Sequence, residues 1–209
     1  MSTVPWEDPA IGFPSNLTRT WIDSLTQPQP FFRALEPEAP LARATLYFLL
    51  MAVGAAFFSL LWGLAGSAPE VPPAAAQIVD LDSRSLQLFG FFLSPFANLL
   101  LLGLAALAVH IFVRLLTDSR LSMVATTRLV CYASGPALLT IVPWVGEIAG
   151  WIGSAVLLAI GVREVHGTTT GRAALTVLLP FLLAAVMFGL AGLFVLAVFA
   201  SLGDLPLAG

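Results

Sequence analysis

Residues 175–202 read LTVLLPFLLAAVMFGLAGLFVLAVFASL and contain no charged side chain. A helix needs about 20 consecutive apolar residues to cross the hydrocarbon core of a bilayer, so this stretch is long enough to span a membrane. The rest of the chain agrees, because 58% of its 209 residues are hydrophobic and only 10% are charged. A soluble domain typically carries about 25% charged residues. The sequence therefore indicates an integral membrane protein.

Four further apolar stretches precede this one and predict an all-α bundle of five membrane-spanning helices. The spans are expected at residues 44–64, 88–116, 123–142, 145–162 and 175–202. Pro95 is expected to break the second span, because proline removes a backbone donor and crowds the preceding turn. Gly135 and Pro136 predict a kink in the third span for the same reason. Pro143 and Trp144 leave only a tight turn between the third and fourth spans, which should form an antiparallel hairpin.

Three glycines recur at helical spacing in the fourth span: Gly146, Gly150 and Gly153. Small residues let helix backbones approach closely in lipid. The pattern favours close packing within this bundle. A homo-oligomer that uses the same glycines as its interface is the alternative.

A polar, proline-rich tail at residues 1–40 precedes the membrane domain at residues 41–204. No apolar core begins before Leu41, so the tail does not have the pattern of a signal peptide. Ser15 is expected to cap a short helix that ends near Leu25.

One apolar stripe follows that short helix at positions Leu17, Trp21 and Leu25. Two placements fit the stripe. The helix lies in the membrane interface, anchored by Trp21, or it packs against the cytoplasmic ends of the bundle. Phe31 and Phe32 lead towards the first span and are further candidates for interfacial anchors.

The arginines predict the topology, because positive residues concentrate in cytoplasmic loops. All nine basic residues are arginine, and eight fall on one side of the predicted spans: Arg19, Arg33, Arg43, Arg114, Arg120, Arg128, Arg163 and Arg172. The opposite side carries one arginine and four acids: Arg84, Glu70, Asp80, Asp82 and Asp204. We therefore expect a cytoplasmic N-terminus and a C-terminus outside. The absence of lysine is typical of a GC-rich genome and favours the bacterial cytoplasmic (inner) membrane.

Cationic side chains at the predicted cytoplasmic boundary are candidates for binding anionic lipid or a protein partner. These candidates are Arg114, Arg120, Arg128, Arg163 and Arg172, together with the polar aromatic residue Tyr132. The net charge of −3 gives no basic face of the kind that binds nucleic acid.

His110, Glu164 and His166 form the only combination that invites a metal hypothesis, because imidazole and carboxylate groups suit zinc. Their spacing matches no metal-binding signature, and interfacial histidines are more often hydrogen-bonded packing residues than metal ligands. No G-x-S-x-G or P-loop motif is present. We therefore expect no resident metal, no cofactor and no enzymatic activity.

The order and spacing of several short motifs resemble those of the Yip1-domain family, specifically its bacterial members. The motifs cover about residues 28–200: Pro30-Phe31-Phe32, His110 with Arg114, Arg128-Leu-Val-Cys-Tyr-Ala-Ser-Gly-Pro136, Ile141-Val-Pro143, Gly161-Val-Arg-Glu-Val-His-Gly-Thr-Thr-Thr-Gly-Arg-Ala173, and Pro180. The resemblance implies a five-helix bundle with a cytoplasmic N-terminus. Eukaryotic relatives bind Rab GTPases in membrane traffic and carry Asp-Leu-Tyr-Gly-Pro in their tail, a motif that residues 1–40 lack.

The resemblance without that motif implies a non-enzymatic membrane adaptor or organising protein that engages protein partners, itself or lipid. The alternative is a small transporter, channel or lipid-translocating protein, metal-linked through His110 and His166. Prolines in the second, third and fifth spans motivate it, because discontinuous helices often build midplane sites. Asn98 and Tyr132 are the main polar residues that such a site would use.

Overall fold

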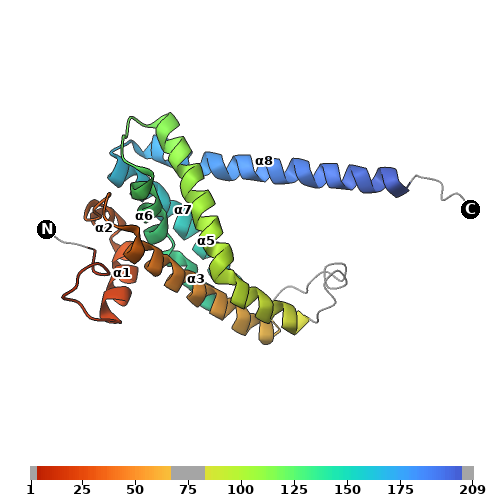
Figure 1. The fold of residues 1–209 in the computed structure, drawn as a ribbon, viewed down its shortest axis with the longest axis horizontal. Coiled ribbons are helices and arrows are strands. Elements are labelled where there is room, and N and C mark those ends of the chain that lie inside the picture. The colour runs from red at the N-terminus through yellow and green to blue at the C-terminus, as the bar shows by residue number, and fades with distance from the viewer. Residues whose placement is uncertain (1–3, 67–82, 204–209) are drawn as a thin grey trace, which may run out of the picture.

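The computed structural model describes residues 4–66 and 83–203, and their regular structure is helical throughout (Figure 1). Its elements are α1 (Ser15–Thr26), α2 (Pro28–Arg33), α3 (Leu41–Leu64), α5 (Ser83–Leu116), α6 (Met123–Ala133), the 3₁₀ helix η1 (Gly135–Ile141), α7 (Val145–His166) and α8 (Thr170–Gly203). The four acids assigned above to the outer side lie outside the described residues.

Four helices of the described chain are long and apolar enough to cross a membrane: α3, α5, α7 and α8. They correspond to four of the five predicted spans. The third predicted span, residues 123–142, is divided into an 11-residue α-helix and a seven-residue 3₁₀ helix. Pro136 has no N–H, and the next N–H, on Ala137, bonds Ser134 O at 2.9 Å, three residues back. The predicted kink lies at this change of helix type.

Helix α5 runs unbroken through Pro95, so the predicted break in the second span is wrong. Proline leaves the carbonyl four residues earlier without its usual partner. Here Ser94 Oγ donates to that carbonyl, Phe91 O, at 2.8 Å, and Asn98 Nδ2 donates to Ser94 O at 2.8 Å. Side chains replace backbone donors in this way where proline is tolerated inside a membrane helix.

The predicted hairpin is present, with η1 and α7 in close contact. Val145 N donates to Pro143 O at 2.8 Å, which closes a tight turn around Trp144. Trp144 has φ 68° and ψ −63°, the strained geometry of a γ-turn. The tight turn predicted from the sequence is therefore confirmed.

The glycines of α7 face η1, as the packing interpretation predicts. A methyl group built on Gly146 would lie 1.8 Å from Leu139 O, and one on Gly150 would lie 3.0 Å from Pro136 O. Real Cβ atoms essentially never approach within 3.0 Å of a neighbour. Only glycine therefore permits this approach at position 146.

The tail folds back onto the bundle through α1. Leu17, Trp21 and Leu25 pack against the buried cluster, and Trp21 Nε1 donates to Gly135 O at 2.8 Å. Ser15 makes no capping hydrogen bond, because Pro14 occupies the N-cap position. The predicted cap is therefore wrong, although the helix begins where expected.

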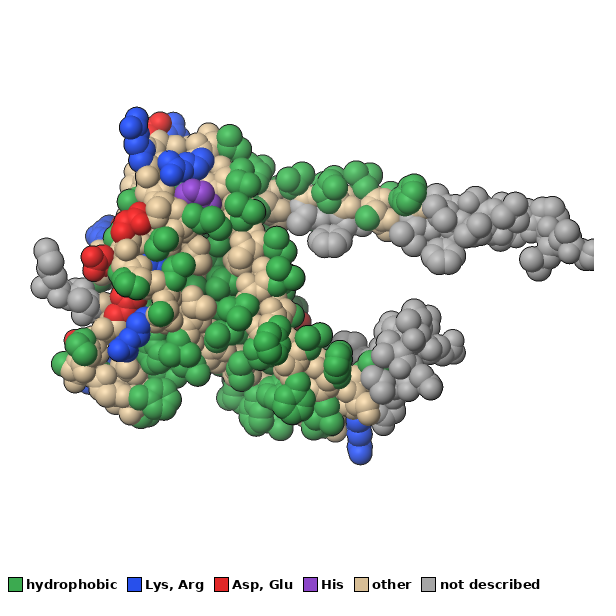
Figure 2. Space-filling view, in the orientation of Figure 1, with side chains coloured by type: hydrophobic (Ala, Val, Ile, Leu, Met, Phe, Trp, Pro, Cys, Tyr) green, Lys and Arg blue, Asp and Glu red, His purple; other side chains and the backbone are tan. Residues whose placement is uncertain are grey.

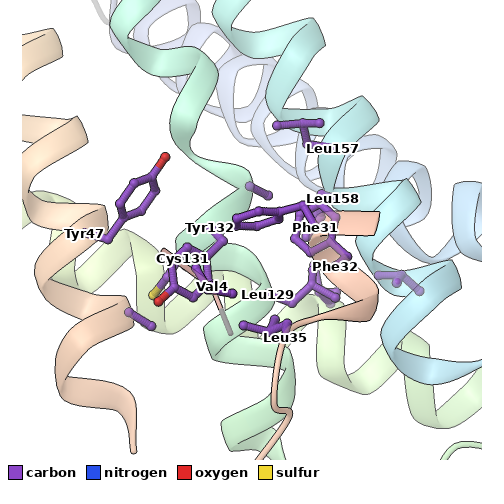
Figure 3. Packing of buried hydrophobic residues seen from close by; sticks show 14 of the residues in the cluster. Val4, Phe31, Phe32, Leu35, Tyr47, Leu129, Cys131, Tyr132, Leu157 and Leu158 are labelled. Atoms are coloured by element: carbon purple, nitrogen blue, oxygen red, sulfur yellow. The ribbon is translucent and has the colours of Figure 1, made fainter. Parts of the chain in front are cut away.

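Phe31 and Phe32 are core residues and not interfacial anchors. Their side chains are 5% and 1% exposed. Figure 3 shows them beside Tyr132 and Leu129, and the rings of Phe31 and Tyr132 lie 5.7 Å apart. α2 therefore inserts its aromatic residues between α6 and α7.

Helix α8 departs from the bundle after its first turns (Figure 1). Ala173, Thr176 and Val177 are buried, whereas the described side chains beyond Pro180 are exposed. Those side chains are almost entirely apolar, which suits lipid contact.

Candidate functional site

Two short connections form one end of the molecule, which we call the loop end. They are residues 117–122, between α5 and α6, and residues 167–169, between α7 and α8. Ser119 Oγ lies 2.9 Å from Nδ1 of His166, the last residue of α7, which joins the first connection to the helix end that precedes the second. Figure 2 shows cationic side chains gathered at this end with histidine beside them.

The two histidines meet through a threonine that the sequence analysis did not identify. His110 Nδ1 lies 2.9 Å from Thr126 Oγ1, and Thr126 Oγ1 lies 3.4 Å from His166 Nε2. Thr126 is fully buried on α6. A hydrogen-bonded chain therefore links α5, α6, α7 and Ser119 of the loop end.

Arg114 determines which atoms act as donors in this series of hydrogen bonds. Its Nε donates to His110 Nε2 at 3.3 Å, which leaves Nδ1 of a neutral His110 as the donor to Thr126. The terminal nitrogens of Arg114 donate to Ser119 O at 3.4 Å and Leu121 O at 3.1 Å. Arg114 therefore holds the first connection in place and is partly used by the fold.

The proposed metal ligands do not converge. Glu164 binds Arg33 Nε at 2.6 Å and also pairs with Arg163, so its carboxylate is already neutralised. Across residues 4–66 and 83–203, no three histidine, cysteine or acidic side chains form a group suited to a metal ion. His110 and His166 serve hydrogen bonding in this arrangement.

Arg128 is hydrogen-bonded to the tail of the same chain and does not face a partner. It is 0% exposed. Its Nε donates to Glu36 O at 3.0 Å, its Nη1 to Pro40 O at 2.8 Å, and its Nη2 to Glu7 Oε1 at 2.7 Å. Tyr132 O–H also donates to Glu7 Oε1, at 2.6 Å. Two residues expected to bind a partner or lipid, Arg128 and Tyr132, therefore fasten three parts of the tail to α6.

The first residues of the tail are part of this arrangement and were missed by the sequence analysis. Trp6 is 4% exposed, its backbone N–H donates to Thr20 Oγ1 at 2.8 Å, and its Nε1 donates to Arg43 O at 2.7 Å. The sequence signal for this contact was a large aromatic residue, Trp6, beside an acid, Glu7. Their surroundings in a proline-rich tail concealed it.

The tail also caps α6. Ser122 is the N-cap residue, and its Oγ accepts from Val124 N at 3.1 Å. Glu38 accepts from both the backbone N–H and the hydroxyl of Ser122. These hydrogen bonds lower the pKa of Glu38 below its ordinary value of 4.5.

A polar cavity of about 400 Å³ opens at the loop end. It is lined by Asp118, Ser119, His166, Gly167, Thr168, Thr169 and Arg172. Arg172 Nη1 and Asp118 Oδ2 lie 3.6 Å apart, the longest ion pair among the described residues. Arg120 is exposed nearby and has no hydrogen-bond or ion-pair partner within the described chain. Arg120 and Arg172 are therefore the predicted binding arginines that remain available.

A second cavity, of about 330 Å³, lies between α3 and α5. Its lining is mainly apolar: Ala56, Ser59, Leu60, Gln87, Gly90 and Phe91. Gln87 Oε1 is buried and has no hydrogen-bond partner in the described structure. None of the described residues that line this cavity is charged.

No curated protein and no solved structure matches the chain. The family model of the Yip1 domain matches residues 22–201. The match begins within α1 and extends into α8, so it covers the tail helices, the hairpin and the loop end. This chain is a multi-pass membrane protein that belongs to the Yip1 domain family.

Proposed function

We propose that the protein is a non-enzymatic membrane adaptor or organising protein that engages anionic lipid or a protein partner at its loop end. One observation carries the proposal: Arg120 is exposed there without a partner in the described chain, and Arg172 has only its exposed 3.6 Å ion pair with Asp118, whereas Arg128 is saturated by the tail. An arginine near an anionic membrane surface contributes about 1 kcal/mol of attraction. The absence of a metal-ligand group among the described residues is consistent with the proposal but does not carry it.

The proposal places the loop end and the N-terminus in the cytoplasm, with five crossings and the C-terminus outside, in a bacterial inner membrane. Laid end to end, α6 and η1 would rise about 30 Å, which is close to the thickness of the hydrocarbon core. They supply the fifth crossing. Alkaline phosphatase fused after Leu202 is then active, whereas an inactive fusion beside a fluorescent GFP fusion contradicts this topology.

Affinity purification from native membranes in mild detergent, followed by mass spectrometry of proteins and lipids, tests the function. The wild type is compared with an R120Q/R172Q variant. An R19Q/R84Q variant, which removes the same charge from two other exposed positions, is the matched control. We expect a stoichiometric partner or enriched anionic lipid in the wild type and control, and its loss from R120Q/R172Q. Equal recovery from all three proteins contradicts the proposal.

Transport is the second candidate function, and the cavity between α3 and α5 favours it. The unpartnered Gln87 Oε1 is an acceptor that a passing solute or lipid would use. Solute or lipid flux in proteoliposomes that falls in Gln87→Leu would support this function. The same flux in wild type, variant and empty liposomes would remove it.

A further inference from the structure

We propose that the polar cavity at the loop end binds a terminal phosphate group, that is, a phosphomonoester or free phosphate. This inference rests on the proposed function and names the chemistry of its anionic ligand. The cation of this cavity, Arg172, differs from Arg128, which the tail saturates. Arg172 has only a long and exposed ion pair.

Donors of several kinds line this cavity. Arg172 brings a planar guanidinium, which binds phosphate through two parallel hydrogen bonds. Thr168 and Ser119 bring hydroxyl groups from the two different connections. A terminal phosphate presents three acceptor oxygens and a charge of about −1.5 to −2, whereas a phosphodiester has fewer free oxygens and a single charge. Because these donors come from separate segments, they suit a group with several free oxygens. They therefore favour a phosphomonoester over a phosphodiester.

These donors are available at small cost. The side chains of Arg172 and Asp118 are 55% and 103% exposed, and an exposed ion pair contributes little stability. The hydroxyl of Thr168 makes no hydrogen bond within the described chain. By contrast, Arg163 is held by Glu164 and lies 3.3 Å from Thr170 Oγ1. The ligand therefore has to displace Asp118 from Arg172 and to share the hydroxyl of Ser119 with His166.

The part of the cavity lining formed by His166 is held in place by hydrogen bonds. His166 is 7% exposed and is held between Ser119 and Thr126, through the chain that reaches His110. A preorganised wall lowers the entropy lost on binding. The first backbone N–H groups of α8 have no acceptor within the helix. They add positive potential near Arg172, which lies in the first turn of α8, but they do not define the site.

Asp118 provides a test that loss of folding cannot imitate. Its carboxylate lies at the cavity and competes with the ligand for Arg172. Asp118→Asn removes that competitor and its repulsion of an anion. We therefore expect D118N to bind the ligand about threefold to tenfold more tightly, equivalent to the loss of one weak charge interaction.

The experiment is a lipid titration of the purified full-length protein by native mass spectrometry. Short-chain phosphatidic acid supplies a phosphomonoester, phosphatidylglycerol supplies a diester, and inorganic phosphate is the soluble competitor. The variants are R172Q, T168V and D118N. R19Q is the matched control, since it removes the same charge from an exposed position outside the loop end, and R120Q is compared as the other available arginine of the loop end, which lies outside the cavity lining. Circular dichroism checks that all variants keep the helical content of the wild type.

We expect phosphatidic acid to bind about tenfold more tightly than phosphatidylglycerol, a preference that R172Q and T168V lose and R19Q keeps. Competition by inorganic phosphate only at large excess assigns the site to a lipid headgroup. Competition at equal concentration assigns it to free phosphate, and both results support the site.

Equal binding of the two lipids, with R172Q and R120Q weakened alike, overturns the cavity site but leaves anionic-lipid binding by the proposed function intact. Binding of neither lipid to the wild type overturns both the cavity site and the lipid arm of the proposed function. A D118N variant that binds phosphatidic acid more weakly than the wild type also overturns the cavity site.

Discussion

The hairpin of η1 and α7 and the part of α8 beyond Pro180 are both apolar, yet they differ in packing. The most apolar windows of α7 and α8 have mean hydropathies of 1.8 and 2.5. A methyl group on Gly146 would collide with the backbone of η1, whereas one on Gly189 or Gly192 of α8 would meet nothing within 4 Å. Hydropathy therefore indicates which segments can enter a membrane, while close contacts decide which segments hold the protein together.

Gly146→Ala is expected to have the largest effect, because its methyl group would lie 1.8 Å from Leu139 O and backbone cannot move aside cheaply. We expect no monodisperse protein on size-exclusion chromatography in detergent. Gly189→Ala is the matched control and should behave like the wild type. A normal elution profile for Gly146→Ala would show that the hairpin is looser than described.

Arg128→Met should destabilise the folded helical bundle by about 3 kcal/mol, because it leaves Glu7 and two carbonyl groups without their cation. Thermal unfolding in detergent measures the loss. Adding Glu7→Gln should cost less than the sum of the two single changes, because both remove one interaction. Additive losses would indicate that the pair does not contribute as a unit. Arg120→Met, at an exposed and unpaired position, is the control.

Hydropathy was sufficient to predict the four long helices and the hairpin, but it failed where side chains replace backbone donors. Pro95 looks like a break because the rule considers proline alone. The hydroxyl of Ser94 restores the hydrogen bond that proline removes, and this depends on its rotamer. The division of the third span at Pro136 was predicted as a kink from Gly135 and Pro136, and the structure places the change from α-helix to 3₁₀ helix there.

The site was harder to predict because its contacts are long in sequence. Arg128 and Glu7 are 121 positions apart, and no local pattern pairs them. His110 and His166 were noticed as residues, but Thr126, which joins them, has no distinguishing sequence context. Charge alone predicted that eight arginines lie on one side of the membrane, and this topology stays a prediction. Which arginines stay available could be decided only from their partners.

Trp21→Phe should lower the stability of the folded helical bundle by a moderate amount. It keeps the aromatic contact with the core but removes the hydrogen bond to Gly135 O, which contributes about 1 kcal/mol. Thermal unfolding should show a small, reproducible decrease in Tm. Trp151→Phe on the exposed face of α7 should leave Tm unchanged. Equal shifts in the two variants would mean that the indole hydrogen bond is unimportant.

The smallest effect concerns the tail contact between Glu38 and Ser122. Hydrogen bonds lower the pKa of Glu38 below 4.5, so its contribution to stability is present above that value and is lost as the pH falls through the lowered pKa. The Tm difference between wild type and Glu38→Gln should therefore be present at pH 7 and shrink below about pH 4.5. A difference that does not change with pH would contradict this sign.

Site-specific photocrosslinking in native membranes tests the central claim most directly, since it compares the loop end with α8 in one experiment. A photoreactive residue replaces Arg120 at the loop end or Leu190 on the exposed surface of α8. We predict a discrete protein or anionic-lipid adduct from position 120, and only bulk-lipid adducts from position 190. A discrete protein adduct from position 190, with none from position 120, would contradict the assignment of function to the loop end.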